Sequence, residues 1–323
     1  MSAADLPPAS PMADLPTTSP GPDPKPGASA PMAPAAADVN TTEVLVEALP
    51  YIRQFFGTTI VVKYGGNAMT DPMLAESFAA DIVLLHSVGI RVVVVHGGGP
   101  QIGDLMKRLG KESEFRDGLR VTDAETLDIA RMVLVGKVNR DIVASINTHG
   151  PLAVGLSGED AGLIEAGLRH PELGFVGDVK NVNPAIVQSL LVQDLIPVVS
   201  TIGADLEGQA YNINADAVAG ALAGALEAEK VIYLTDIAGL LRDVTDPSSL
   251  IPATDTTEIA GLIETGVLSG GMIPKIEACL EALAAGVPSA HLLDGRVPHV
   301  VLLELFTRAG VGTMITTSSE ELS

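Results

Sequence analysis

From Thr58 onward, short apolar runs of strand length alternate with longer segments of helical periodicity. This alternation is typical of consecutive βαβ units, which place parallel strands in one sheet and cover both of its faces with helices. We therefore predict an α/β fold, a three-layer α/β/α sandwich around an open, mostly parallel sheet. The expected strands span residues 58–63, 91–96, 152–157, 196–202, 230–235 and 289–294. The expected helices span residues 72–88, 100–109, 123–148, 184–193, 214–227, 255–266, 273–285 and 297–306.

Two segments between these elements carry turn signals. Phe115–Thr122 contains Asp-Gly, and Gly174–Val182 contains Gly-Asp. Both pairs are common in hairpin turns, so we predict a hairpin at each place and, together, a lid beside the main sheet.

The first 40 residues differ from the rest in composition, since they hold ten of the 22 prolines. We predict a disordered, Pro/Ala-rich tail over residues 1–40. A separate amphipathic helix is expected over residues 41–57, capped by Asn40 and kinked at Pro50. This helix precedes every strand, so it could dock on its own domain or join another subunit.

Composition excludes several classes of partner and site. The formal net charge of −21 would repel a nucleic acid rather than attract it. No apolar run reaches the roughly 18 residues of a membrane span, and no signal or transit peptide is evident, so we expect a cytoplasmic protein. The single cysteine, Cys279, excludes an intrachain disulfide and a cysteine-based metal site, and its apolar helical pattern predicts a place in the core.

The first strand ends in an unusual way, because the apolar run from Ile60 leads directly into Lys63, Gly65 and Gly66. Open α/β sheets bind ligands at the carboxyl ends of their strands. Paired glycines there let the backbone approach a phosphate without an intervening side chain. The alternative is a lysine that reaches solvent from a strand end.

The second strand ends in His96-Gly97-Gly98-Gly99-Pro100, just before a predicted helix. Bare N–H groups at a helix N-terminus favour an anion. The tetrapeptide His-Gly-Gly-Gly, here His96–Gly99, forms the oxyanion hole of some esterases. Those enzymes also need a G-x-S-x-G elbow, which is absent from the sequence. The dinucleotide fingerprint and the P-loop pattern are absent as well.

Other polar residues invite either a functional or a local explanation. Arg120 could clamp a carboxylate or be a loop charge. Asn214 and Asp216 could simply cap the helix that follows them, but this leaves Asn212 unexplained. Lys275 opens a helix at the positive end of its dipole, which is unfavourable unless an anion is present.

Taken together, these motifs resemble the amino-acid kinase family, most closely its members that phosphorylate N-acetyl-L-glutamate, from about Val44 to the C-terminus. The matching pieces are VVKYGGNAM, VHGGGPQIG, DGLRVTD, YNINADAVAG, YLTDIAGLL and SGGMIPK. The resemblance implies transfer of the γ-phosphoryl group of ATP, which carries Mg²⁺, to the side-chain carboxylate of N-acetyl-L-glutamate. This reaction is the second step of arginine biosynthesis.

The resemblance also implies roles for single residues. Lys63 and Lys275 would converge on the phosphoryl group, with Asp216 between them, as the catalytic set. Substrate binding would fall to Gly98, Gly99, Arg120, Asn212 and Asn214. ATP binding would fall to Gly65, Gly66, Thr235, Asp236, Gly239, Leu240, Gly271 and Met272. The kinase domain would span 58–323, with acetylglutamate in a lobe of about 58–205 and ATP in a lobe of about 206–323.

A further resemblance concerns control. Arginine-inhibited members carry an extra kinked N-terminal helix that interlaces dimers into a hexamer, a trimer of dimers. The likeness implies a homohexamer and an arginine site formed by Tyr51, His291, Glu304 and Gly310. Glu304 lies in an apolar run, where a guanidinium would be a suitable partner. The alternative is a glutamate that faces solvent.

Rival functions remain open at this point. Another carboxylate kinase of the same fold could act on N-acetyl-aminoadipate, glutamate or aspartate, since Arg120 and Asn212 suit any such substrate. A uridylate kinase would call for more basic residues. A non-enzymatic arginine sensor would need none of Lys63, Asp216 and Lys275.

Overall fold

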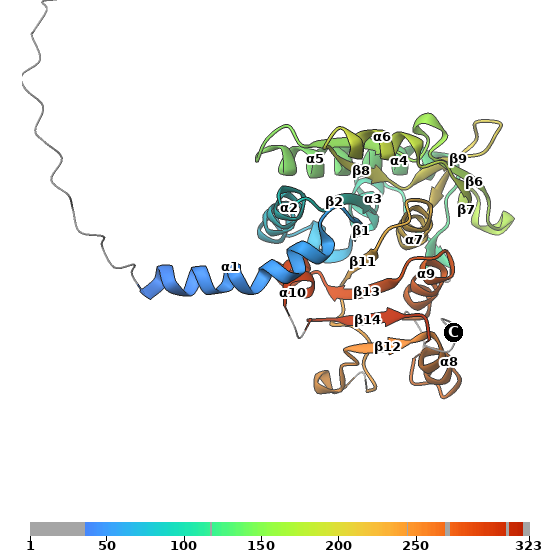
Figure 1. Ribbon diagram of the computed structural model, residues 1–323. Helices are drawn as coiled ribbons and strands as arrows, with labels where there is room; N and C mark the ends of the chain where they lie inside the picture. Colours follow the sequence, from blue (N-terminus) through green and yellow to red (C-terminus); the bar gives the residue numbers. More distant parts are fainter. Residues whose placement is uncertain (1–35, 117, 244, 269–271, 308–309, 319–323) are drawn as a thin grey trace, which may run out of the picture. The chain divides into compact units, whose positions relative to one another are not determined.

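The computed structural model describes residues 36–116, 118–243, 245–268, 272–307 and 310–318 (Figure 1). For residues 36–44, 67 and 247 only the backbone is described. The chain divides into two units after Val46, and the second unit, Glu47–Ser323, contains every strand found in the described residues.

Eight strands form the central sheet of the second unit (Figure 1). Neighbouring strands run parallel except for one antiparallel pair, β13 with β14. The mostly parallel sheet is therefore confirmed, and all six predicted strands are present within two residues of their expected bounds. In spatial order the strands are β12 (Ala253–Asp255), β14 (Thr313–Thr316), β13 (Ser289–Asp294), β11 (Lys230–Thr235), β1 (Thr59–Tyr64), β2 (Arg91–His96), β8 (Ile196–Ser200) and β5 (Ala153–Ser157).

Helices cover both faces of this sheet, so the three-layer sandwich is confirmed. Successive strand residues point to opposite faces, and Ile60 and Val62 of β1 lie in one core while Val61 lies in the other. The first core is closed by α2 (Pro72–Ser87), α3 (Gly99–Arg108), α4 (Ala124–Arg131), α5 (Asn139–Asn147) and α10 (Val300–Phe306). The second is closed by α6 (Ala185–Val192), α7 (Ala215–Ala225), α8 (Thr256–Glu264) and α9 (Ile273–Ala284). Cys279 is fully buried in the second core, as predicted.

The helix predicted over 123–148 is continuous but changes type. A π-helix, η2 (Met132–Val138), separates α4 from α5. Single π-helical turns inside an α-helix are frequent at functional sites, and this one directly precedes Asn139.

Beside the sheet lies a small closed barrel that periodicity did not predict. Its strands are β6 (Ile164–Leu168), β7 (Val176–Val182), β9 (Ile202–Ala204) and β10 (Ala210–Ile213). The hairpin predicted over 174–182 is wrong, because these residues form the single strand β7, which pairs antiparallel with β6. Gly177 is required for packing rather than for a turn, since a Cβ there would lie 2.6 Å from Cβ of Tyr211.

The hairpin predicted over 115–122 is confirmed, with β3 (Phe115–Arg116) paired antiparallel to β4 (Leu119–Arg120). Its action as a lid stays a prediction. Short 3₁₀ turns complete the second unit: η1 (Gly66–Met69), η3 (Asp160–Gly162), η4 (Pro171–Leu173) and η5 (Pro247–Ser249).

The N-terminal helix α1 (Ala36–Phe55) begins five residues earlier than predicted. Asn40 therefore lies inside the helix rather than at its N-cap, since Ala36 and Ala37 carry the highest helix propensity and extend it. Pro50 lies within α1, while the kink there stays a prediction. No helix in the described ranges is long and apolar enough to cross a membrane.

Candidate active site

Three charged side chains from distant parts of the chain meet at the carboxyl end of β1. Lys63 shares a strand face with Val61, so it points toward α7 and α9. Its Nζ lies 2.8 Å from Oδ1 of Asp216, the second residue of α7. The Nζ of Lys275, in the first turn of α9, lies 3.5 Å from Oδ2 of the same carboxylate. The structure thus brings Lys63, Asp216 and Lys275 together.

The electrostatics of this cluster leave one positive charge in excess. Burial by itself would raise the pKa of Asp216, but the charges of Lys63 and Lys275 lower this pKa below its ordinary value. Asp216 therefore stays ionised, and two ammonium groups share a single carboxylate. Nζ of Lys63 lies at ion-pair distance from Oδ1 of Asp216, and an ammonium carries three N–H groups, so the others can turn toward another anion.

The glycines that follow β1 leave room for the charged groups around them. A Cβ at Gly65 would lie 2.7 Å from Nζ of Lys63. Gly66 has a φ of +71°, and a Cβ there would lie 2.6 Å from Oδ1 of Asp236. A side chain at Gly65 would therefore displace the Lys63 ammonium from its position beside Asp216. A side chain at Gly66 would displace the Asp236 carboxylate and would also be strained at this positive φ.

The second glycine loop lies next to the first. Tyr64 at the end of β1 pairs with His96 at the end of β2, and the N–H of Gly97 donates to the carbonyl of Tyr64 over 3.2 Å. Gly98 and Gly99 then begin α3, whose first N–H groups have no partner within the helix. Two sets of backbone donors therefore border the lysine cluster.

Arg120 is a buried cation held by neutral groups. Its Nη2 donates to the carbonyl oxygen of Gly99 over 2.8 Å, and its Nη1 donates to the hydroxyl of Ser113. The guanidinium lies 4.7 Å from the ring centroid of Phe115, and burial lowers the pKa of Arg120. No carboxylate of a described residue forms an ion pair with it. A buried guanidinium with this environment suits a carboxylate ligand.

The two asparagines of the segment 211–216 do different things. Asn212 lies on β10 of the barrel, and its Nδ2 is 3.4 Å from Oγ1 of Thr122, which links it to the Arg120 hairpin. Asn214 caps α7, because its side chain accepts the N–H of Asp216 over 2.7 Å. Helix capping therefore explains Asn214. Asp216 also lies in the first turn of α7, but its carboxylate is paired with Lys63 and Lys275.

Known proteins are similar to this chain over most of its length. Residues 58–294 match the model of the amino acid kinase family. A protein of Pelotomaculum thermopropionicum named "Acetylglutamate kinase" is 54% identical over 284 residues, which are 84% of this chain and 96% of that protein. A protein of Nostoc sp. with the same name is 55% identical over 280 residues, which are 86% of this chain and 94% of that protein. This chain belongs to the amino acid kinase family.

Solved structures of the amino acid kinase family share the fold. The N-acetylglutamate synthase of Neisseria gonorrhoeae, complexed with coenzyme A and N-acetyl-glutamate, is 29% identical, with a TM-score of 0.76. The match covers 86% of this chain and 64% of the synthase, so this chain spans less than two thirds of that protein. The carbamate kinase of Giardia lamblia bound to AMP-PNP is 18% identical, with a TM-score of 0.59. The match covers 81% of this chain and 99% of the carbamate kinase, and at this identity it shows the fold alone.

The relatives named acetylglutamate kinase, at 54–55% identity over most of the chain, together with the family match make this chain a kinase. The residues predicted to bind the nucleotide differ in where they lie relative to the lysine cluster. Thr235 ends β11 and is buried, and Asp236 follows it beside Gly66. Leu240 is fully buried, and its N–H donates to Oγ1 of Thr313 over 2.8 Å, so its part in nucleotide binding stays a prediction.

Three other residues assigned to nucleotide binding lie close to these elements or outside the described part. Gly239 has a φ of +140° and is also packed against Thr313. Met272 is the residue immediately before α9, and Gly271 lies outside the described residues.

Three of the four residues predicted to bind arginine lie together. Nδ1 of His291 is 2.7 Å from Oε1 of Glu304, and the N–H of Val311 donates to the other carboxylate oxygen over 2.8 Å. A Cβ at Gly310 would lie 2.9 Å from the same oxygen. The Glu304 side chain is only 7% exposed, so the solvent-facing alternative is wrong. Its charge already has partners in this structure, with hydrogen bonds that lower the pKa of Glu304 against the effect of burial.

Lys230 lies beside His291 and Glu304, and the sequence did not lead us to predict it as part of this site. Its Nζ lies 3.1 Å from Nε2 of His291 and 5.4 Å from the ring centroid of Phe55. A charged residue at the start of a buried strand was the available signal. Tyr51, the fourth predicted residue, lies on α1 and packs against the first core.

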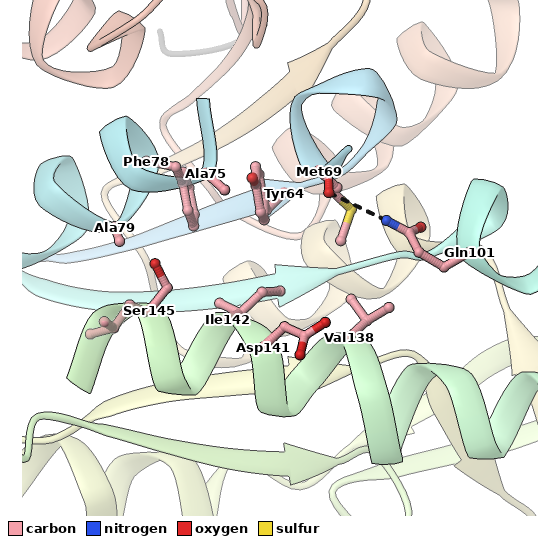
Figure 2. A pocket seen from close by; sticks show the side chains of 11 residues that line it. Tyr64, Met69, Ala75, Phe78, Ala79, Gln101, Val138, Asp141, Ile142 and Ser145 are labelled. Carbon is pink, nitrogen blue, oxygen red and sulfur yellow. Dashed lines mark hydrogen bonds between the residues drawn. The ribbon is translucent and has the colours of Figure 1, made fainter. Parts of the chain in front are cut away.

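A cavity of about 80 Å³ opens between α2 and α5 (Figure 2). Tyr64 and Phe78 stack along it with ring centroids 3.9 Å apart, and Nε2 of Gln101 bridges to the carbonyl oxygen of Met69 over 3.5 Å. It belongs to the first core, whereas Lys63 points to the opposite face. The lysine cluster does not line this cavity, so it is not part of the candidate active site.

Proposed function

We propose that this chain transfers the γ-phosphoryl group of ATP to the side-chain carboxylate of N-acetyl-L-glutamate. The observation that carries the proposal is the placement of Asp216 between Lys63 and Lys275 at the carboxyl end of β1. The reaction joins two anions, a carboxylate and a polyphosphate. Two ammonium groups held by one carboxylate would offset the repulsion between the reactants and the charge of the transition state.

In this reaction a carboxylate oxygen attacks the γ-phosphorus while the bond to the β-phosphate oxygen breaks. The products are ADP and the acyl phosphate N-acetyl-L-glutamyl 5-phosphate. The N–H groups of the two glycine loops are suited to the transferring oxygens, since they lie at the carboxyl ends of adjacent strands. The reaction would be a step of arginine synthesis, in keeping with the names of the relatives.

Arg120 and Asn212 are suited to the other end of the substrate. The buried guanidinium would take the α-carboxylate, and the amide of Asn212, linked to it through Thr122, would take the acetamido group or the amino-acid backbone. The lobe of about 58–205 would hold acetylglutamate, with Asn212 contributed by the lobe of about 206–323, which would hold the nucleotide.

Mg²⁺ would arrive with ATP. Within the described ranges there is no group of three or more His, Cys, Asp or Glu side chains that could hold a metal ion. Mg²⁺ is commonly bound by substrate phosphates with few protein ligands, so this donor set is compatible with a nucleotide-borne ion. Its role would be to neutralise phosphate charge.

Control by arginine belongs to the same proposal. The synthase of Neisseria gonorrhoeae was also solved with coenzyme A and L-arginine, at 26% identity and a TM-score of 0.71, over 86% of this chain and 65% of the synthase. In this chain the buried Glu304 carboxylate next to Gly310 offers an anion to a guanidinium, which would compete with His291. Joining of subunits through α1 into a hexamer, a trimer of dimers, completes the proposal, as does a cytoplasmic location.

The test is ADP release from the full chain with ATP, Mg²⁺ and N-acetyl-L-glutamate, with and without millimolar arginine. N-Acetyl-aminoadipate, glutamate and aspartate serve as competing acceptors. Turnover selective for acetylglutamate is expected. Selective turnover of another acceptor would reassign the substrate. Turnover that ignores arginine would remove His291 and Glu304 from control, and no turnover together with arginine binding would favour a sensor.

A further inference from the structure

A buried histidine–asparagine pair lies directly behind the glycine loop of α3. Nδ1 of His96 is 2.9 Å from the carbonyl oxygen of Gly97, and its Nε2 is 3.1 Å from Nδ2 of Asn139. Both side chains are fully buried. Neither belongs to the groups that would touch substrate or nucleotide, so their polar contacts serve the protein itself.

The contacts of Asn139 identify the tautomer of His96. Nδ2 of Asn139 also lies 2.8 Å from the carbonyl oxygen of Val198 and 3.3 Å from that of Leu156. Carbonyl oxygens only accept, so this atom is the donating amide nitrogen, and a proton on Nε2 of His96 would face another donor. The ring proton is therefore on Nδ1 and is donated to Gly97. Burial lowers the pKa of His96 to about 4, which keeps the ring neutral at neutral pH.

The bond to Gly97 has a geometric consequence for Gly98. The described residues contain no cis peptide bond, and in a trans peptide the C=O and the N–H point in opposite directions. When His96 holds the carbonyl of Gly97, the N–H of Gly98 is turned away from the core, toward the start of α3. There is little room for a side chain at residue 98, since a Cβ there would lie 2.7 Å from Cδ2 of Leu134.

Two features of the fold put Asn139 in place for this contact. The π-helix Met132–Val138 ends immediately before it, and the wider turn shifts the register of the helix at that point. On the facing strand β5, a Cβ at Gly155 would collide with Oδ1 of Asn139. Residue 155 must therefore lack a side chain for the amide to reach His96.

We propose that His96 and Asn139 are positioning residues that direct the Gly97–Gly98 peptide so that the N–H of Gly98 faces the reacting carboxylate and phosphoryl group. This inference rests on the proposed phosphoryl transfer. A donor that already points at the developing charge needs no reorganisation during the reaction, which is where backbone donors contribute most to catalysis.

The test compares two substitutions of one residue. In His96→Asn the amide nitrogen occupies the place of Nδ1 and can still donate to Gly97. In His96→Gln the amide is one carbon farther away, at the place of Nε2, so Asn139 keeps a partner but Gly97 loses its donor. Both remove the ring. We expect kcat to stay within about threefold in His96→Asn and to fall about tenfold or more in His96→Gln, with smaller changes in KM.

Equal losses of kcat in the two variants would overturn the proposal, because a merely structural role depends on the lost ring and not on the place of the donor. Unchanged kcat in His96→Gln would overturn it as well. Thermal unfolding of both variants shows whether they fold.

A measurement on the unaltered full chain does not depend on the variants. The ¹⁵N chemical shifts of the His96 ring, assigned by their loss in His96→Asn, should show a neutral Nδ1–H tautomer from pH 6 to 8. An Nε2–H tautomer, or protonation within this range, would overturn the proposal. If the unaltered chain released no ADP, the proposed function would fail. The measured tautomer would still show whether His96 donates to Gly97 and so orients the Gly97–Gly98 peptide.

Discussion

At the residue scale, the chemistry depends on how many charges share one buried carboxylate. Lys63 and Asp216 are 7% and 8% exposed, so their attraction is screened less than that of a surface pair. Surface ion pairs such as Lys137–Asp141 are formed by exposed side chains and contribute little to stability. This contrast supplies matched controls for substitutions in the cluster.

Replacing either lysine of the cluster should remove transition-state stabilisation. We expect Lys63→Met and Lys275→Met each to lower kcat by about 10²–10³-fold, because one of two charges that would face the phosphoryl group is lost. Lys137→Met, at an exposed lysine on η2, should leave kcat unchanged. Steady-state ADP release measures all three. Near-normal turnover in either cluster variant would remove that lysine from the mechanism.

Arg120 depends on its fork rather than on its charge alone. We expect Arg120→Lys to raise KM for acetylglutamate about 10–100-fold with a smaller effect on kcat, since an ammonium cannot keep the bonds to Gly99 and Ser113 and still bind a carboxylate bidentately. The control is Arg116→Lys on the same hairpin, whose guanidinium is exposed and paired with Glu114. An unaltered KM in Arg120→Lys would show that the guanidinium does not bind substrate.

At the element scale, α2 and α10 are joined by a buried acid. Oδ1 of Asp81 on α2 lies 2.6 Å from Nδ1 of His299, the N-cap residue of α10, and the N–H of His299 donates to Ser77. Burial raises the pKa of Asp81 to about 6, although hydrogen bonds and charge from His299 act against this rise. The helix that carries Glu304 is thus anchored by a titratable contact.

The sign of its pH dependence follows from the raised pKa. Folded Asp81 holds its proton up to about pH 6, whereas an unfolded aspartate loses it near pH 4, so protonation favours the folded state. The stability contributed by Asp81 is complete below about pH 4 and is lost as the pH rises through 6.

We therefore expect the free energy of unfolding of the unaltered chain, relative to Asp81→Asn, to increase by on the order of 2 kcal/mol as the pH falls from 7 to 4. Urea unfolding at several pH values measures this difference, and exposed Asp128→Asn on α4 serves as the control. A difference that stays flat, or that shrinks on acidification, would contradict the raised pKa.

At the scale of the whole molecule, the boundary between the two units defines where an N-terminal truncation should end. The division falls after Val46, inside α1, while Phe55 at the end of α1 is buried in the first core. A deletion reaching residue 56 would therefore remove part of the core along with the proposed joining helix. Removing residues 1–46 spares Tyr51 and Phe55.

We expect the chain without residues 1–46 to elute as a dimer and to lose most of its arginine inhibition, because the helix that would interlace dimers is shortened. The chain without residues 1–35, which all precede α1, should remain a hexamer. Sizing chromatography with light scattering, followed by the arginine titration, distinguishes them. A hexamer that survives the longer deletion would refute assembly through α1.

Much of this protein could be predicted from its sequence because the information was local. Apolar runs and helical periodicity located all six predicted strands and the helices that cover them, since side chains two or three to four residues apart share a face. The consecutive glycines after β1 and β2 were also recognisable in the sequence, because they indicate a close approach of the backbone to a neighbouring group. Lys63 and Lys275 stood out because each puts a charge where its own strand or helix disfavours one.

Only the tertiary structure decided what depends on distant segments meeting. The strands of the barrel are too mixed in pattern to be recognised, and Gly177 suggested a turn, whereas the structure shows Tyr211 packed against it. The contact of His291 with Glu304 and the contact of His96 with Asn139 join segments that are 13 and 43 residues apart. Burial and pairing of such groups are properties of the packed chain, and no local periodicity records them.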